Sequence, residues 1–203
     1  MGVARDWLVR AQTLAGQEAR KRDQESPVDS LFADIVREET RADVALLPGV
    51  GYGVAIPPGP ITAAQLRQLV PHDGKVFTMQ LAGAQLRDIL EQSVENTFSD
   101  DPATRVGGMI QVAGIRFRFD PRRSHGRRVL EIATLSGDWD HGRKYLVATN
   151  SLLAQGGHNY REFLRAENVK QRQAQYEMVK RWIKEHSPVR TPPLGRIRRV
   201  GSS

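Results

Sequence analysis

The chain of 203 residues contains no cysteine. That absence excludes disulfide bonds, thiolate zinc sites and cysteine nucleophiles, although it says little about the compartment. No apolar run approaches the roughly 20 residues that a helix needs to cross a bilayer, so we expect no membrane partner. Near the N-terminus, Arg5, Asp6 and Arg10 interrupt the apolar positions before the hydrophobic region of a signal peptide can form. The chain as it stands therefore predicts no export, and a cytoplasmic location if it is full-length.

The composition indicates one folded domain with a basic surface. The residues are 39% hydrophobic and 26% charged, which is typical of a globular domain and not of a fibre or a disordered chain. At roughly 150 residues per domain, the length favours a single core with a short appendage. The 30 Lys and Arg residues outnumber the 23 Asp and Glu residues, which gives a formal charge of +7. This excess favours an acidic partner without naming one.

Apolar spacing predicts a succession of helices and strands. Spacings of three and four residues predict helices over residues 7–15, 27–36, 62–70, 83–96 and 169–186. Short apolar or alternating runs predict strands over residues 43–47, 75–81, 109–119, 128–135 and 145–149. Short turns separate the last three strands, which favours an antiparallel meander. The loop at residues 48–61 holds four prolines and four glycines, too many for a helix or a central strand.

This order of elements predicts an α+β fold in which a mixed β-sheet is covered by helices. We assign residues 1–24 to an N-terminal helical appendage or linker, residues 25–200 to one domain and residues 201–203 to a tail. Two helix starts have clear local signals. Ser26 precedes Pro27 as an N-cap, and Thr62-Ala63-Ala64-Gln65 has the form of a capping box.

Four stretches, taken in order, resemble the C-terminal domain of the 5'-nucleotidase and UDP-sugar hydrolase family. They are residues 42–53 with Gly59-Pro60-Ile61-Thr62, residues 70–91 (VPHDGKVFTMQLAGAQLRDILE), residues 107–120 (GGMIQVAGIRFRFD) and residues 145–163 (YLVATNSLLAQGGHNYREF). The resemblance covers nearly everything after residue 25. It implies the fold of that domain and a role in hydrolysis of nucleotides or related phosphoesters, in which this domain clamps the nucleoside or sugar part of the substrate.

The resemblance also implies that the metal chemistry lies outside this chain. In that family an N-terminal metallophosphatase domain holds two metal ions with carboxylates, histidines and an asparagine. Here the five histidines are scattered, and no Asp-x-His or Gly-Asn-His motif occurs. We therefore expect no cofactor, no metal and no catalytic residue in this chain, and no hydrolysis by it alone. The implied partner is a metallophosphatase domain with its divalent metal ions, on the same or a separate chain, and the implied substrate is a small anion such as a nucleotide.

The sequence departs from the family where the substrate is held. Residues 47–52 (LPGVGY) replace the family's Asn-Gly-Gly-Gly-Ile-Arg, and residues 156–160 (GGHNY) replace Gly-Gly-Asp-Gly-Phe. The two stacking phenylalanines fall at Val76, beside Phe77, and at Leu152. Rings and polar groups from the two altered loops are the available replacements. The candidate substrate-binding residues are accordingly Tyr52, Phe77, Leu152, Gly156, Gly157, His158, Asn159 and Tyr160.

Several candidates have an equally simple structural interpretation. Packing of Tyr52 on its own glycine-rich loop explains that ring as well as ligand contact does. His158 is typical of a turn residue in the left-handed conformation. Gly156 and Gly157 fit a backbone requirement, because no Gly-Lys-Ser/Thr phosphate motif follows them.

The substrate stays open between two branches of the superfamily. Residues 48–53 (PGVGYG) and 107–114 (GGMIQVAG) are similar to motifs of the thiosulfohydrolases of bacterial sulfur oxidation. Residues 153–157 (LAQGG) point back to the nucleotidases, whose members are usually periplasmic or on the cell surface. A different class of function, a non-enzymatic binding domain derived from this fold, also stays open.

Arginines gather in two segments. The first brackets one predicted hairpin and contains Arg116, Arg118, Arg122, Arg123, Arg127 and Arg128. The second, near the C-terminus, contains Arg190, Arg196, Arg198 and Arg199. Phe117 and Phe119 alternate with the first arginines and so face the core, which leaves no exposed aromatic for base stacking. We interpret the two segments as a solvated hairpin and a basic tail, and expect no nucleic-acid partner.

Overall fold

The computed structural model describes residues 9–11, 23–49, 59–72, 74–135 and 137–201. Its centre is a five-stranded sheet in the order β5-β2-β8-β4-β9. Its strands are β5 (Gln111–Ala113), β2 (Val44–Leu47), β8 (Lys144–Asn150), β4 (Lys75–Ala82) and β9 (Glu167–Ala174). Strands β2 and β8 are parallel, whereas the other three pairs are antiparallel. The predicted mixed sheet is therefore confirmed.

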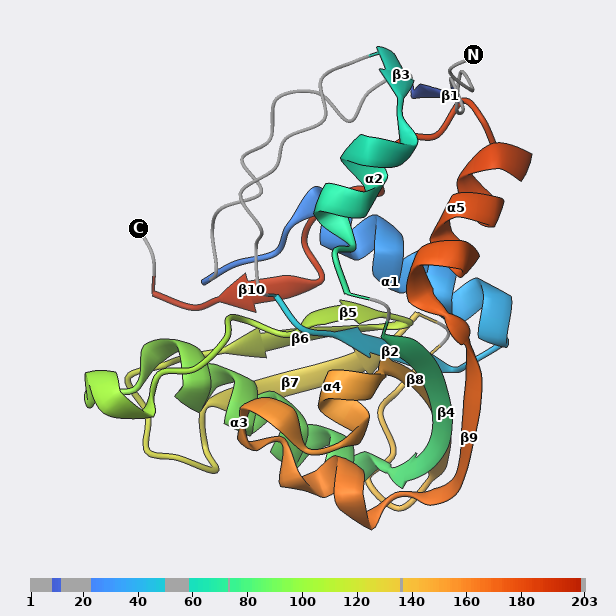
Figure 1. The fold of residues 1–203 in the computed structure, drawn as a ribbon. Helices are drawn as coiled ribbons and strands as arrows, with labels where there is room; N and C mark the ends of the chain where they lie inside the picture. The colour runs from blue at the N-terminus through green and yellow to red at the C-terminus, as the bar shows by residue number, and fades with distance from the viewer. Residues whose placement is uncertain (1–8, 12–22, 50–58, 73, 136, 202–203) are drawn as a thin grey trace, which may run out of the picture.

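Helices cover both faces of this sheet (Figure 1). On one face lie α1 (Pro27–Thr40), α2 (Ala63–Leu69) and α5 (Gln175–Glu185). On the other lie α3 (Gly83–Phe98) and the short α4 (Ser151–Ala154). Successive side chains of β2 enter opposite hydrophobic clusters, Ala45 and Leu47 on the α1 side and Val44 and Leu46 on the α3 side. All four are buried, as expected for a strand covered on both faces.

The starts of α1 and α2 follow their sequence signals. The Ser26 hydroxyl accepts a hydrogen bond from the Asp29 backbone N–H at 3.4 Å, with Pro27 in the first helical turn. The Thr62 hydroxyl accepts from the Gln65 N–H at 3.2 Å, and the Gln65 side chain accepts from the Thr62 N–H at 2.8 Å. In α2 the two reciprocal bonds form the capping box, and in both helices the N-cap residue fixes where the helix begins.

Two smaller sheets complete the described part of the chain. One has the order β10-β6-β7, with β6 (Ile115–Phe119), β7 (Val129–Thr134) and β10 (Ile197–Arg199). The other pairs β1 (Val9–Ala11) with β3 (Gly59–Ile61). Three 3-10 turns lie at η1 (Pro102–Thr104), η2 (Gly157–Asn159) and η3 (Arg161–Arg165). No helix among the described residues combines the length and the apolar character needed to cross a membrane.

The predicted meander is wrong. The run 109–119 splits at Gly114, whose φ of 84° turns the chain from the large sheet into the small one. Strands β6 and β7 then pair antiparallel, but β8 leaves them and enters the large sheet between β2 and β4. Tyr145, Val147 and Ala148 are buried in β8 and occupy both clusters. A strand with buried side chains on both faces needs packing partners on both faces, and the β6–β7 hairpin cannot supply them.

Two predicted helices also need correction. The helix expected over residues 169–186 begins only at Gln175, because residues 167–174 pair with the free edge of β4 instead. Backbone pairing there outweighs the helical propensity of a Lys, Gln and Arg-rich run. In the predicted helix 7–15, the described residues Val9–Ala11 form a strand that pairs with β3. The remaining positions of that prediction lie outside the described residues.

Candidate functional site

A pocket of about 460 Å³ lies where several strands of the large sheet end together. Because β2 and β8 are parallel, Leu47-Pro48 and Asn150-Ser151 leave the sheet at the same edge. Strand β4 runs antiparallel to β8 and starts at this edge just after Gly74, and β9 ends there before Gln175. The volume of the pocket falls in the usual range of small-molecule sites.

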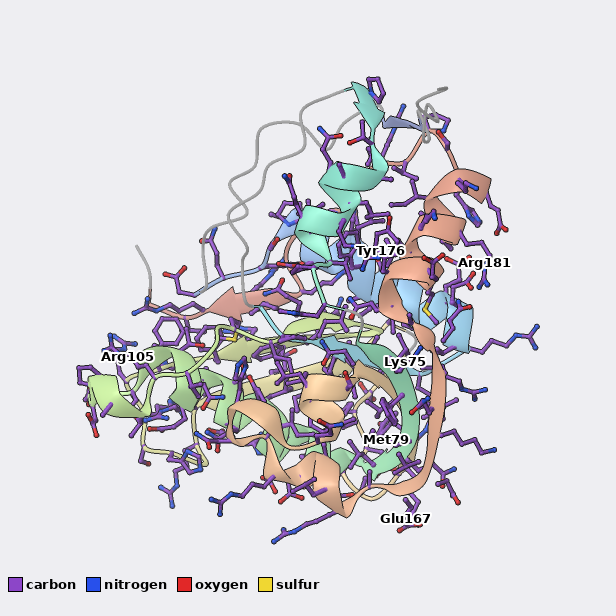
Figure 2. All side chains as sticks on the ribbon, viewed as in Figure 1. Lys75, Met79, Arg105, Glu167, Tyr176 and Arg181 are labelled. Atoms are coloured by element: carbon purple, nitrogen blue, oxygen red, sulfur yellow. The ribbon has the colours of Figure 1, made fainter. Side chains whose placement is uncertain are left out.

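Helix ends close the pocket above the strands. The first turns of α1 supply Asp29 and Phe32, and the end of α2 with the segment that follows it supplies residues 69–72. Helix α2 is held against α5 by the Arg67 guanidinium, which lies 3.7 Å from the centroid of the Tyr176 ring. Figure 2 shows Tyr176 between these two helices. This contact fixes the segment after α2 over the strand ends.

The pocket combines apolar walls with a few polar groups. The apolar lining consists of Phe32, Leu47, Pro48, Leu69, Val70, Pro71 and Leu152. The polar side chains are Asp29, His72, Asn150, Ser151, Gln155, His158 and Gln175. This mixture is typical of sites that bury the organic part of a ligand and orient it with a small number of hydrogen bonds.

Asp29 is the carboxylate of the pocket lining among the described residues. It lies in the α1 wall beside Phe32. Burial raises the pKa of its carboxyl from 3.8 to about 6, and a hydrogen bond with the Ser26 hydroxyl opposes that rise. A carboxylate in such a place accepts hydrogen bonds and repels a second anion. It is therefore a selective feature of the pocket.

The structure brings two of the predicted residues, Leu152 and His158, into the pocket. His158 has φ 55°, so it is a left-handed turn residue and a pocket residue at once. Its carbonyl accepts a 2.7 Å hydrogen bond from the Asn96 side chain, and its ring covers Gly107 so closely that a Cβ there would lie 2.5 Å from Nδ1. These contacts hold the imidazole at the pocket.

The neighbouring Gly156 and Gly157 meet backbone requirements of the turn. Gly156 has φ 74°, which favours glycine. At Gly157 a Cβ would lie 2.6 Å from the carbonyl oxygen of Leu152. Both residues thus let the chain turn tightly after α4, in agreement with the backbone interpretation of the Gly-Gly pair, and they place Leu152 and His158 on one rim.

The other candidates that the structure describes lie away from the pocket lining. Phe77 is partly buried and packs against the cluster on the α3 side. Tyr160 is buried in the same cluster, where desolvation raises its pKa to about 12. Its hydroxyl lies near Ser93 and Asn96 without forming a well-shaped hydrogen bond. Asn159 lines a different depression beside α3, and Tyr52 lies outside the described residues.

Sequence reasoning missed six polar residues of the pocket, three beside Leu152 and three from other parts of the chain. They are Asn150, Ser151 and Gln155, and Asp29, His72 and Gln175. The sequence signal that could have identified some of them is their position at a junction between a predicted strand and a predicted helix. Asn150 ends a buried strand and caps α4 by accepting the Leu153 N–H at 3.2 Å, and His72 lies between a helix and a strand. Such junctions carry binding residues more often than element interiors do.

Within the described ranges, no group of three or more His, Asp or Glu side chains is arranged to hold a metal ion. The pocket itself contains one carboxylate and two imidazoles among apolar walls. Its donor set fits an organic ligand better than a pair of divalent ions, which require several converging carboxylates and histidines.

A family model described as 5'-nucleotidase, C-terminal domain, matches residues 8–165. The chain belongs to this family. The 5'-nucleotidase C-terminal domain resemblance and the fold that it implied are thereby confirmed.

Similar proteins agree with this assignment. The trifunctional nucleotide phosphoesterase protein YfkN of Bacillus subtilis is 28% identical over 92% of this chain, which spans 13% of that protein. A solved 5'-nucleotidase precursor of Thermus thermophilus is 27% identical, with a TM-score of 0.84 over 98% of this chain and 40% of that one. The 5'-nucleotidase C-terminal domain described here thus spans less than half the length of either relative.

A solved sulfate thiohydrolase of Thermus thermophilus has a TM-score of 0.73 and is 23% identical, covering 96% of this chain and 36% of the other. At that identity the likeness shows the fold alone. It carries no argument about which substrate this 5'-nucleotidase C-terminal domain binds.

Proposed function

We propose that this domain is the substrate-recognition part of a 5'-nucleotidase-like metallohydrolase. In this proposal the pocket at the strand ends holds the nucleoside part of the substrate. The observation that carries it is the roughly 460 Å³ cavity with apolar walls and a sparse polar rim, found in a member of this family. The nucleotide-directed names of its relatives support the choice of a nucleoside.

Asp29 gives the bound substrate a direction. Above a pH of about 6 its carboxyl is ionised and would repel a phosphoryl group placed beside it. The same carboxylate would accept a hydrogen bond from an exocyclic amino group of a base. The base therefore enters the pocket and the phosphoryl group stays outside, where a metallophosphatase domain on the same or a separate chain would act on it.

Calorimetric titration with adenosine tests the pocket. Leu152→Trp fills the rim at a side chain that is already 39% exposed, and we expect at least about tenfold weaker binding. Leu135→Trp is the matched control, because Leu135 is exposed and lies outside the pocket lining. Melting curves establish that both variants are folded. Equal affinity of the two variants, or no adenosine binding by the unaltered chain, would overturn the proposal.

A pair of ligands tests the orientation. Purine riboside lacks the amino group of adenosine and cannot donate a hydrogen bond to Asp29. We expect adenosine to bind about tenfold more tightly than purine riboside at pH 8, and Asp29→Leu to abolish this preference. A preference that survives in Asp29→Leu would contradict the orientation while leaving the pocket intact.

The metallophosphatase partner is tested by addition in trans. We expect this chain to lower the KM for a nucleoside monophosphate when it is added to a metallophosphatase domain that lacks its own C-terminal domain. The Leu152→Trp variant should fail to do so. If the unaltered chain binds adenosine but leaves the KM unchanged, a binding domain that acts without a catalytic partner becomes the better explanation.

A further inference from the structure

A second hollow, unrelated to the nucleoside pocket, lies on the small sheet. It measures about 470 Å³ and is lined by Arg116, Phe117, Arg118, Glu131, Gly195 and Arg198. It shares no lining residue with the pocket at the strand ends. The two basic segments that the sequence kept apart, the hairpin and the C-terminal segment, meet here.

Strand pairing places the guanidiniums side by side. Strand β10 runs parallel to β6, with Arg198 in register with Arg118. Adjacent strands are about 4.8 Å apart, so in-register side chains on one face are neighbours. Arg116 lies two residues before Arg118 and therefore on the same face, and all three arginines are exposed while Phe117 between them is buried.

The lining leaves positive charge uncompensated. Glu131, opposite Arg118 on β7, forms a 3.0 Å ion pair with it. Against one carboxylate stand three guanidiniums, and like charges on neighbouring strand positions destabilise a sheet. A bound anion would relieve this repulsion.

The backbone around the hollow is held firmly. The carboxylate of Glu25 accepts hydrogen bonds from the N–H groups of Gly195 and Arg196, at 2.6 and 2.9 Å. The Arg196 guanidinium forms a two-pronged pair with Asp34 of α1, at 2.9 and 2.7 Å. Arg198 Nε donates to the Gly195 carbonyl at 3.1 Å, which orients its remaining N–H groups. The backbone that carries Arg198 therefore needs little reorganisation when an anion binds.

We propose that Arg116, Arg118 and Arg198 form a binding site for a phosphate-class oxyanion of small size, of which pyrophosphate is the representative. Guanidinium groups match the geometry of phosphoryl oxygens and bind them with paired hydrogen bonds. A nucleic-acid strand is the less suitable occupant, because the exposed large apolar side chains among the described residues are all aliphatic and offer no stacking surface.

Titration with pyrophosphate at constant ionic strength tests the site. We expect binding to the unaltered chain and a loss of at least about tenfold in affinity in the double variant Arg116→Gln/Arg198→Gln. Arg127→Gln/Arg161→Gln is the matched control, because it removes the same charge from two exposed arginines outside the hollow. If the double variant has a lowered melting temperature, the single variant Arg116→Gln replaces it in the titration, because Arg116 lies at an exposed strand position.

Three outcomes would overturn the proposal. The first is no pyrophosphate binding at millimolar concentration, and the second is equal weakening in the variant and its control, which indicates diffuse attraction by the net charge. The third is tighter binding of a single-stranded oligonucleotide that the double variant loses, which makes a polymer the ligand. Adenosine affinity should be the same in every one of these variants. A failure of the anion site is therefore distinguishable from a failure of the proposed nucleoside pocket.

Discussion

The pocket at the strand ends and the hollow on the small sheet are built on opposite principles. Helices and strand termini enclose the first in apolar side chains, with Asp29 as the carboxylate of its described lining. The second is an open strand face with three arginines and little apolar cover. The basic character of the chain therefore lies apart from the pocket. An organic ligand and an anion would meet different parts of one molecule.

The largest expected effect is on the start of β7, the strand whose Glu131 lines the hollow, and not on the pocket. Buried Glu91, on α3, accepts backbone N–H groups of Gly126, Arg128 and Val129 at 3.1, 3.2 and 2.7 Å. Glu91→Leu leaves these donors unsatisfied and should lower the free energy of unfolding by about 3 kcal/mol. Urea unfolding measures the change, and pyrophosphate affinity should fall with it while adenosine affinity holds.

The control for this change is Glu177→Leu, at an exposed position of α5, which should alter stability by less than about 0.5 kcal/mol. Equal destabilisation by both substitutions would show that the buried carboxylate has no special role. A parallel loss of both ligands in Glu91→Leu would show that the two regions are not independent.

The next effect concerns the pocket and pH. The folded pKa of Asp29 is about 6, against an ordinary value of 3.8. Between these pH values the unfolded chain releases the proton and the folded chain keeps it, so stability falls as pH rises from about 4 to 6. Below pH 4 the Asp29 carboxyl is protonated in both the folded and the unfolded chain. Above pH 6 it is ionised in both, and the loss of unfolding free energy stays constant.

Asp29→Asn should remove that loss. After allowance for the partial exposure of the side chain, we expect the variant to be more stable than the unaltered chain by about 1 to 2 kcal/mol at pH 8 and equal to it at pH 4. The informative quantity is the difference in unfolding free energy between the variant and the unaltered chain at each pH, because all other titratable groups are common to both. Asp138→Asn, at an exposed position, is the control. A difference that does not vary with pH would contradict the assignment to Asp29.

The smallest effect sharpens the account of the hollow. Glu131→Gln removes the carboxylate opposite Arg118 and leaves all three arginines in place. Because the pair is exposed, stability should change by less than about 1 kcal/mol. Pyrophosphate affinity should rise about threefold, as expected when one competing negative charge leaves a solvated site. A fall in affinity would mean that Glu131 orients Arg118 for binding.

The sequence predicts the local features of this molecule better than its assembly. Ser26 and Thr62 were sufficient to locate two helix starts, because an N-cap acts on its own first turn. Strand β9 was not predictable from its residues, because its conformation depends on the free edge of β4. The family resemblance supplied the fold.

The pocket was predicted only in part for the same reason. Leu152 and His158 belong to motifs that can be compared within a family, and both lie in the pocket. Asp29, His72 and Gln175 come from three other elements that meet only after the sheet has formed. The hollow is a similar case, because the in-register pairing of Arg198 with Arg118 joins segments 80 residues apart.

The account depends most on the pocket, and amide chemical-shift mapping with adenosine tests it directly. We predict that adenosine shifts the signals of Asp29, His72, Leu152 and His158, and that pyrophosphate instead shifts those of Arg116, Arg118 and Arg198. Adenosine shifts confined to β6 and β10, or shifts by both ligands at the same residues, would contradict the separation of the two sites and the assignment of the nucleoside to the strand ends.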